Sequence, residues 1–358
     1  MNLIGEHTDY SGGFVLPIAI HRGIRGAVRA RDDGLVTVIS DGFGTDSFPL
    51  DVQEISTGDW RAYPRSVMHE LRAVAGARLR GFDLALVSDL PARAGLASSA
   101  ALEAAVARAA VGVAGFSIDP IALAGVCQRA EHSGPGVQCG IMDQAVVLAS
   151  MEGFAMLLDC RTYEALSISF PTDHWSIVAI DTLKDRTLAA SAYNERRQSV
   201  EEATAHIARI FPEIRDLSDV SPAVLDGSAL PEHLHRRARH VVTENLRTLQ
   251  LVIALSESDA TATRQAMAGS HASLRDDYEV SCPELDALVA HADATGICDG
   301  SRLTGAGFGG CTVNLVPHEE VDAFVAQVQQ RFLARFGAVP TAHHLHPGAP
   351  ATFSERES

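Results

Sequence analysis

The feature that most restricts the fold is an Ala-rich segment at 100–114 that is apolar on nearly every side. A helix of this kind has no face for water, so we expect it to be buried inside a domain. It follows a strand-like run at 82–87 and a loop of small residues at 91–99. The chain has 358 residues, of which 46% are hydrophobic and 21% charged. These values are ordinary for a folded protein with sizeable cores, and the length favours two lobes.

The loop before this helix is suited to binding an anion. The first turn of a helix leaves backbone N–H groups unpaired at the positive end of the helix dipole. Small side chains around Gly95 let phosphate oxygens approach the backbone, and the hydroxyls of Ser98 and Ser99 are able to bind phosphate or a magnesium ion. The alternative is that Ser98 only caps the helix. The segment has neither the lysine of a Walker loop nor the G-x-S-x-G motif of a hydrolase.

A second glycine-rich loop at 305–310 matches the pattern G-x-G-x-x-G. A dinucleotide-binding loop of this pattern follows a strand and opens a helix. Here the loop follows a polar stretch at 299–302 and precedes a strand-like run at 311–316. We therefore do not expect a dinucleotide-binding domain.

Carboxylates provide the third signal. Glu6, His7 and Asp9 lie close together in a glycine-bounded turn, and Glu131 lies near the end of a predicted helix. Asp143 is surrounded by apolar residues, so if it is buried it needs a partner or a shifted pKa. A single carboxylate is usually a helix cap or a surface charge. Three such groups beside a candidate phosphate loop favour a site.

The order of elements predicts an α+β fold with two lobes. Strand-like runs dominate up to about residue 165, and helical patterns dominate after it. We expect one lobe over 1–165 and the other over 166–358. A capping box at 281–284 is expected to begin a helix that reaches residue 292. The expected strands are 14–20, 23–30, 35–40, 82–87, 154–158, 166–170, 175–180 and 311–316; the expected helices are 60–75, 100–114, 120–131, 141–148, 191–210, 231–257, 283–292 and 319–336.

Composition excludes several classes of protein. The formal net charge of −16 argues against a binder of nucleic acid or of a membrane surface. No apolar run approaches the roughly 20 residues needed to cross a bilayer, and no leader peptide is recognisable. The six cysteines are scattered, which indicates reduced thiols rather than a disulfide framework. These features predict a cytoplasmic protein.

The motifs together resemble the galactokinases of the GHMP small-molecule kinase superfamily. The resemblance is carried by the string NLIGEHTDYSGG at 2–13, the loop at 95–103 and the block at 130–144, with further matches at 193–197, 280–286 and 302–311. It implies a two-lobed GHMP kinase fold with an N-terminal and a C-terminal kinase domain. It also implies transfer of the γ-phosphoryl group of ATP to the C1 hydroxyl of α-D-galactose, with Mg²⁺ as cofactor.

The resemblance also implies roles for individual residues. Asp143 would be the catalytic carboxylate that accepts or orients the proton of the C1 hydroxyl, and Ser99 and Glu131 would bind magnesium. The sugar would be held by Glu6, His7, Thr8, Asp9, Gly140 and Tyr193. The phosphates would be wrapped by the loop residues Arg93, Ala94, Gly95, Leu96, Ala97, Ser98 and Ser99. Adenine would lie beside Ser40, Trp60 and Tyr63. The alternative for the two aromatic residues is that they are core residues on one helix face.

The start of the chain departs from the family pattern. The family motif begins G-R-V-N-L-I-G-E-H, and Met1 stands at the valine position. The family's arginine and the strand before it would precede Met1. We expect a chain extended at its N-terminus to be more stable and much more active than this one.

Two other functions remain as alternatives. One is a non-catalytic sensor of galactose and ATP, and the other is a kinase of a related sugar such as galacturonate, arabinose or N-acetylgalactosamine. Retention of Asp143, Ser99 and Glu131 favours an enzyme over a sensor, and the intact string at 6–10 favours galactose. The expected partners are galactose and MgATP, without nucleic acid or membrane, in a monomer or weak homo-oligomer.

Overall fold

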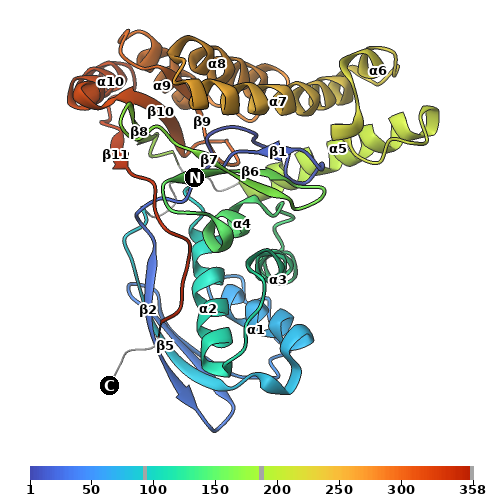
Figure 1. Cartoon of the computed structure of the whole chain (residues 1–358), viewed down its shortest axis with the longest axis vertical. Coiled ribbons are helices and arrows are strands. Elements are labelled where there is room, and N and C mark those ends of the chain that lie inside the picture. Colours follow the sequence, from blue (N-terminus) through green and yellow to red (C-terminus); the bar gives the residue numbers. More distant parts are fainter. Residues whose placement is uncertain (92–94, 185–188, 355–358) are drawn as a thin grey trace. The chain divides into compact units, whose positions relative to one another are not determined.

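Figure 1 shows the computed structural model of the chain, which describes residues 1–91, 95–184 and 189–354, without the side chains of 189 and 190. Contacts divide these residues into two compact units. Unit 1 consists of Met1–Ile20 and Gly153–Gly348 together with Gly95 and Leu96. Unit 2 holds the other described residues, 21–91, 97–152 and 349–354. The predicted boundary at residue 165 divides the chain at one point, whereas these units are interleaved along the sequence. As the boundary between the N-terminal and C-terminal kinase domains of the family, residue 165 stays a prediction.

Unit 2 is a four-stranded sheet with helices against it, and its strand order is β2-β5-β3-β4. The β3–β5 pair is parallel and the other two pairs are antiparallel. The strands are β2 (Ile24–Arg31), β3 (Leu35–Ser40), β4 (Gly44–Pro49) and β5 (Gly81–Ser88). The helices are α1 (Ala62–Ala75), α2 (Ser98–Ala114), α3 (Pro120–Ser133) and α4 (Met142–Ala149), with a 3₁₀ turn at Gly76–Arg78.

Helix α2 is the centre of unit 2, as the Ala-rich pattern predicted. It contacts β2 and β5 on one side and α1, α3 and α4 on the others (Figure 1). Its alanines at 100, 104, 107, 109 and 110 are buried. Small side chains allow this close approach on several sides, which explains a helix without a polar face.

Unit 1 contains two further sheets. The larger is antiparallel, with the order β11-β8-β10-β9, and the smaller has the order β1-β6-β7. The strands are β1 (Phe14–Val15), β6 (Phe154–Asp159), β7 (Ala165–Ser169), β8 (Trp175–Asp181), β9 (Gly300–Leu303), β10 (Cys311–Pro317) and β11 (Thr341–Leu345). In β8, Ile177 and Ala179 join the core with α7 and α8, whereas Val178 and Ile180 pack on α9 and α10. Both faces of this sheet are therefore covered.

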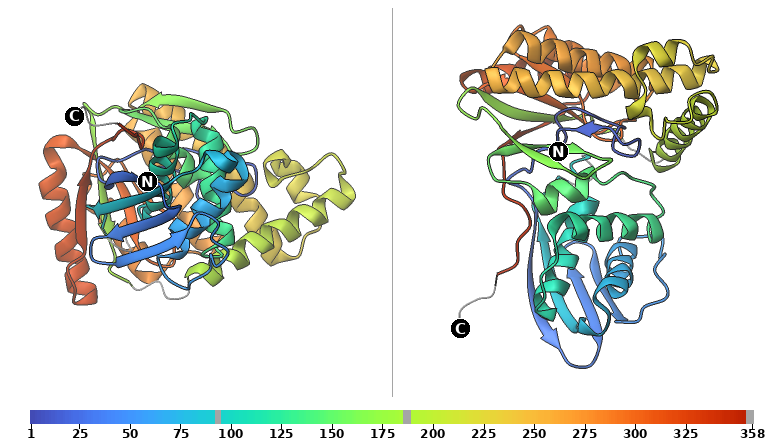
Figure 2. Two further views of the ribbon diagram at one scale, coloured as in Figure 1. Left: turned by 90° about the horizontal axis from the view of Figure 1, so that it is seen from below. Right: turned by 45° about the vertical axis from the view of Figure 1, so that its right-hand side comes forward.

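The helices of unit 1 are dominated by the long pair α7 and α8, which lie side by side (Figure 2). The helices are α5 (Ala189–Ile210), α6 (Pro222–Asp226), α7 (Glu232–Glu257), α8 (Ala260–Asp276), α9 (Pro283–Asp293) and α10 (Val321–Phe336), with 3₁₀ turns at Leu217–Asp219 and His318–Glu320. None of the helices in the described residues combines the length and apolar character that crossing a bilayer requires.

The structure corrects the sequence prediction in several places. The predicted capping box is wrong: α9 begins after Cys282 without a side-chain cap, and the Ser281 hydroxyl donates to Asp286 instead (2.5 Å). The polar stretch before the second glycine loop contains strand β9, so this loop joins two antiparallel strands. Because no helix follows the loop, the exclusion of a dinucleotide fingerprint still holds. Strand β4 and helices α6 and α8 were not predicted, and the predicted strand at 14–20 is reduced to β1.

Candidate active site

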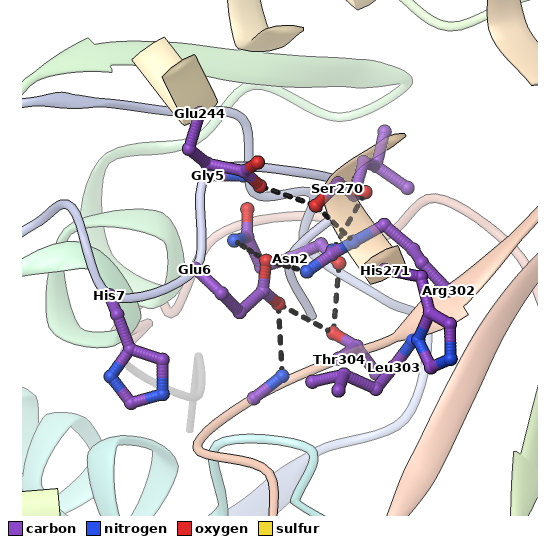
Figure 3. Close-up of polar contacts among 12 residues, drawn as sticks. Asn2, Gly5, Glu6, His7, Glu244, Ser270, His271, Arg302, Leu303 and Thr304 are labelled. Atoms are coloured by element: carbon purple, nitrogen blue, oxygen red, sulfur yellow. Dashed lines mark hydrogen bonds and ion pairs between the residues drawn. The ribbon is translucent and has the colours of Figure 1, made fainter. Parts of the chain in front are cut away.

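Glu6 anchors the turn at residues 2–13 in unit 1. It is 1% exposed, and Gly5 before it has a φ of +97°, where a Cβ would lie 2.6 Å from the Phe14 carbonyl oxygen. The Glu6 carboxylate accepts hydrogen bonds from Asn2 Nδ2 (2.8 Å), Thr304 Oγ1 (3.2 Å), Gly305 N (2.9 Å) and Arg302 Nη2 (Figure 3). Burial raises the pKa of Glu6, and the Arg302 guanidinium opposes that rise. A hydrogen bond from a sugar hydroxyl to the Glu6 carboxylate would be an additional contact and stays a prediction.

His7 is buried in a cluster of aromatic rings. Its Nε2 lies 3.2 Å from the Ala306 carbonyl oxygen, and its Nδ1 lies 2.8 Å from the Tyr10 hydroxyl. Because a carbonyl oxygen only accepts, Nε2 carries the hydrogen and Nδ1 accepts from Tyr10. The Tyr10 hydroxyl in turn lies 2.7 Å from the Tyr278 hydroxyl. Burial lowers the pKa of His7 to about 3, so the ring is neutral at physiological pH.

The structure gathers most of the predicted sugar-binding residues in unit 1. Tyr193, on α5, has its ring centroid 5.2 Å from that of His7. The Thr8 hydroxyl is buried and lies 2.8 Å from the carbonyl oxygens of Gly5 and Phe14. Asp9 follows in the same turn and is partly exposed. Gly140, the remaining residue of the predicted set, belongs to unit 2.

Unit 2 holds a cluster of buried acids. Glu131 lies in the last turn of α3, and Glu103 lies within α2 with no exposed surface. Gln144 of α4 joins them, because its Nε2 donates to Glu131 (2.7 Å) and to Glu103 (3.1 Å). Burial raises the pKa of both carboxyl groups, and the neighbouring charge of Glu131 raises that of Glu103 further. Oε1 of Glu103 and Oε1 of Gln144 have no hydrogen-bond partner among the described residues.

Ser99 and Asp143 complete this cluster. Burial raises the pKa of Glu131 most, and a hydrogen bond from the Ser99 hydroxyl lowers it. Asp143 lies in the first turn of α4, directly before Gln144; burial raises its pKa, and its charge raises that of Glu131. Gly140 is buried in the loop that leads into α4. The structure therefore brings Ser99, Glu131 and Asp143 together.

The start of α2 has no side-chain cap. Its N-cap is Ala97, in the left-handed conformation with a φ of 55°, and Ser98 is the first helical residue. The interpretation of Ser98 as a helix cap is therefore wrong. Ala97, Ser98 and Ser99 belong to unit 2, and Gly95 and Leu96 belong to unit 1. Arg93 and Ala94 lie outside the described residues.

The three residues predicted to lie beside adenine fall into two places in unit 2. Trp60 Nε1 donates to the Phe43 carbonyl oxygen (3.1 Å), and Phe43 N donates to the Ser40 carbonyl oxygen (3.0 Å), so Trp60 and Ser40 both contact Phe43 in the β3–β4 hairpin. Tyr63 lies in the first turn of α1; burial raises its pKa, and the charge of Glu131 adds to the rise. Trp60 precedes α1, so the alternative of two core aromatics on one helix face is wrong.

Several residues of these clusters were missed in the sequence. Glu103 and Gln144 connect the acids of unit 2, while Arg302, Glu244 and His240 surround the turn of unit 1. Glu103 carried a signal, because it is a single acid in an otherwise apolar helix. Gln144 and Arg302 stand at the ends of the matched blocks 130–144 and 302–311 but were given no role of their own. Glu244 and His240 carried no signal, since both lie on an amphipathic helix.

Comparisons with known proteins show the family of this chain. Family models match at residues 62–151 (GHMP kinases N terminal domain), 1–30 (galactokinase galactose-binding signature) and 251–334 (GHMP kinases C terminal). A galactokinase of Roseiflexus sp. is 45% identical over 96% of this chain and 88% of its own length. A galactokinase of Bacillus subtilis is 40% identical over 94% of this chain and 88% of its own length. The chain belongs to the galactokinase family.

Solved structures support the same family. The crystal structure of Lactococcus lactis galactokinase complexed with galactose has a TM-score of 0.93 and 34% identity, covering 98% of this chain and 92% of that chain. The mevalonate kinase of Methanococcus jannaschii has a TM-score of 0.66 at 16% identity over 97% of this chain and 95% of that chain, which shows a shared fold alone. The predicted GHMP kinase fold is confirmed, and this galactokinase-family chain is an ATP-dependent sugar kinase.

Proposed function

We propose that the chain transfers the γ-phosphoryl group of ATP to the C1 hydroxyl of galactose, giving galactose 1-phosphate. The observation that carries the proposal is the cluster of Asp143, Glu131 and Ser99 beside the uncapped first turn of α2. Phosphoryl transfer needs mainly positioning and neutralisation of charge, and these groups supply both. The galactokinase signature over 1–30 supports galactose as the acceptor.

Asp143 handles the proton in this proposal. It accepts or orients the hydrogen of the C1 hydroxyl as the oxygen attacks the phosphorus. Burial raises the pKa of Asp143, which makes its carboxylate a better proton acceptor than an exposed aspartate. The residues proposed to hold the sugar are Glu6, His7, Thr8, Asp9, Gly140 and Tyr193.

The residues of unit 2 fit a magnesium ion. Mg²⁺ prefers oxygen ligands, and the Ser99 hydroxyl and the Glu131 carboxylate are such ligands. The unpartnered Oε1 of Glu103 lies in a cluster of buried acids that Gln144 joins with a neutral amide, which supports a cation there. When bound, the ion neutralises charge on the transferred phosphoryl group. We assign the metal to Ser99 and Glu131.

The nucleotide would be held through backbone groups. The N–H groups of the first turn of α2 suit phosphate because no side chain caps them. The phosphate loop is proposed to include Arg93, Ala94, Gly95, Leu96, Ala97, Ser98 and Ser99. Ser40 and Trp60, which both contact Phe43 in the β3–β4 hairpin, and Tyr63 are proposed to lie beside adenine. A cytoplasmic location and a monomeric or weakly associated state stay predictions.

A coupled assay of ADP release across a panel of sugars tests the proposal. We expect turnover with galactose, and a decrease in kcat of at least about a hundredfold for Asp143→Asn with galactose binding retained. Glu152→Gln, at an exposed position of the same unit, serves as the control and should turn over normally. Full turnover of Asp143→Asn would remove this residue from the mechanism. Tight binding of galactose and ATP without ADP release would indicate a sensor, and turnover restricted to another sugar would indicate a related kinase.

A further inference from the structure

Glu244 is a buried carboxylate at the middle of α7 that contacts the turn at residues 2–13. It has no exposed surface. Its Oε1 accepts hydrogen bonds from Gly5 N (3.2 Å) and Ser270 Oγ (2.5 Å), and its Oε2 accepts from Arg247 Nε (2.8 Å). Gly5 is the residue directly before Glu6 and His7, so Glu244 holds the turn at its backbone (Figure 3).

A second connection runs from Glu244 to the same turn through side chains. Ser270 Oγ donates to Glu244 and accepts from Arg302 Nε (3.1 Å). Arg302, which is fully buried, then donates to the Glu6 carboxylate and to the Leu3 carbonyl oxygen (2.9 Å). Glu244 therefore reaches the turn at Gly5 directly and at Glu6 through two residues.

A third contact comes from the preceding turn of the same helix. His240 Nε2 lies 3.0 Å from the Glu6 carbonyl oxygen, so this nitrogen carries the hydrogen and donates it. Burial lowers the pKa of His240 to about 4, and the ring is neutral. Helix α7 thus binds the backbone on both sides of the Gly5–Glu6 peptide.

The charges in this cluster are balanced. The carboxylates of Glu6 and Glu244 are matched by the guanidinium groups of Arg302 and Arg247. Burial alone would raise the pKa of Glu244, but Arg247 and the other positive groups around it lower the pKa to about 2. Loss of the Glu244 charge would leave two guanidinium groups, the buried one of Arg302 and the partly buried one of Arg247, against one carboxylate. This imbalance is costly in a low-dielectric interior.

The turn has little freedom to adjust if this support is lost. Gly5 is held between the Phe14–Val15 backbone and α7, with a φ that favours glycine. A shift of the Gly5–Glu6 peptide moves His7 and Asp9, which follow it directly. The side chains predicted to hold the sugar therefore depend on the position of this one peptide.

We infer that Glu244 is a positioning residue for sugar binding, which fixes the turn at residues 2–13 through Gly5 and through Ser270 and Arg302. The inference rests on the proposed role of that turn in holding galactose. Glu244 touches neither substrate in this scheme; it acts through the backbone and side chains that it orders. Its removal should therefore change the affinity for the sugar much more than the affinity for ATP.

The test compares the wild-type enzyme with Glu244→Gln, which keeps the size of the side chain and removes its charge. We expect the KM and the calorimetric Kd for galactose to rise by about tenfold or more, because a buried hydrogen bond to a charged group is lost. The KM for ATP should change by less than about twofold, and kcat by less than about threefold. Ser270→Ala should shift the galactose constants in the same direction by a smaller factor.

Asp299→Asn is the matched control. The Asp299 carboxylate accepts from Trp175 Nε1 (2.9 Å) and Arg264 Nη2 (3.2 Å), so it resembles Glu244 in pairing with an arginine and a second donor. It forms none of the contacts described for residues 2–13. We expect this variant to melt at a lower temperature than the wild type with an unchanged Kd for galactose.

The outcomes separate this inference from the proposed function. If the wild-type enzyme neither binds nor phosphorylates galactose, the proposed function is wrong and the inference is overturned with it. If the wild type binds galactose and Glu244→Gln binds it equally well, the inference alone is overturned. If Glu244→Gln does not fold, Ser270→Ala decides: an unchanged Kd in that variant overturns the inference. An equal loss of affinity in Asp299→Asn would show a general effect of instability and would also overturn it.

Discussion

Replacing Arg302 by methionine tests how far the folded state of unit 1 depends on one buried ion pair. Arg302 has no exposed surface, and its guanidinium group contacts Glu6, Ser270 and the Leu3 carbonyl oxygen. Methionine fills much of the same space without the charge or the donors. Arg302→Met should therefore leave the Glu6 carboxylate buried without its counter-ion.

The size of the effect follows from what remains around Glu6. Breaking a buried ion pair by removing one partner costs about 3–5 kcal/mol. The donors from Asn2, Thr304 and Gly305 stay in place, so we expect the lower end of this range, about 3 kcal/mol, or on the order of a hundredfold in the folding equilibrium. The double variant Glu6→Gln with Arg302→Met should lose only about 1–2 kcal/mol of stability relative to the wild type, because no unpaired charge remains.

Tryptophan fluorescence makes the measurement specific for unit 1. The chain has two tryptophans. Trp175 is buried in β8 of unit 1, and Trp60 belongs to unit 2. Urea unfolding in a Trp60→Phe background therefore reports on the unit that contains Arg302. Arg302→Met should lower the unfolding midpoint without changing the slope of the transition.

The pH dependence gives the deciding signature. Burial already raises the pKa of Glu6, and loss of Arg302 removes a group that opposes the rise. A carboxyl group whose folded pKa lies above its unfolded pKa destabilises the folded state at high pH and less so at low pH. The stability lost in Arg302→Met should therefore shrink as the pH is lowered from about 8 to about 5. A cost below about 1 kcal/mol, a cost independent of pH, or a double variant less stable than Arg302→Met would refute this reasoning.

Three further predictions follow from single contacts. Burial lowers the pKa of His240 to about 4. The stability that its neutral ring contributes is therefore complete above about pH 6.5 and is lost as the pH falls towards 4. His240→Gln should flatten this decline in melting temperature, measured by calorimetry at different pH values. Gly307→Ala should lower the free energy of unfolding in urea by about 2–4 kcal/mol, because φ is +79° and the new Cβ would lie 2.2 Å from a carbonyl oxygen. Gly296→Ala, with a φ of +70° but open space around the new Cβ, should lower it by about 1 kcal/mol. Equal losses in the two variants would contradict the steric argument. Gln144→Leu removes a hydrogen-bond donor to Glu131. It should weaken the binding of Mg²⁺ or Mn²⁺ by about tenfold, measured by calorimetry with bound ATP. Unchanged metal binding would mean that Gln144 does not orient Glu131.

The parts of the fold that the sequence predicted well are those with a strong local pattern. Helix α2 is apolar on nearly all sides, and strand β8 is a continuous apolar run between two covering layers. Helix α8 was missed because its sequence, ATATRQAMAGSHASLRD, consists mainly of small residues and has few large apolar side chains to mark a face. Strand β9 was missed because Ser301 and Arg302 are polar yet fully enclosed. Their burial depends on partners elsewhere in the chain, and a local pattern cannot show those partners.

The residues of the candidate site also divide into those with a local sequence pattern and those without one. The residues of the turn at 2–13, and Glu131 and Asp143, were found because they occur in recognisable strings. Glu244 lies 239 positions from Gly5, and Arg302 lies 296 positions from Glu6. Neither the charge nor the spacing of these residues marks them in the sequence, since arginine and glutamate are common on helices and loops. Only the folded chain shows that they belong to the turn.

The two clusters of buried acids differ in what neutralises them, and this difference fits the separate tasks that we propose for them. In unit 1, Glu6 and Glu244 are paired with Arg302 and Arg247, and the pKa of Glu244 is lowered to about 2. In unit 2, Glu103 and Glu131 share the neutral amide of Gln144, and burial raises the pKa of both. A carboxylate matched by an internal cation is already neutralised and serves to hold the shape of the protein. Acids that receive only neutral donors have the charge left to bind a cation from solution, which is the requirement for a magnesium site in a kinase.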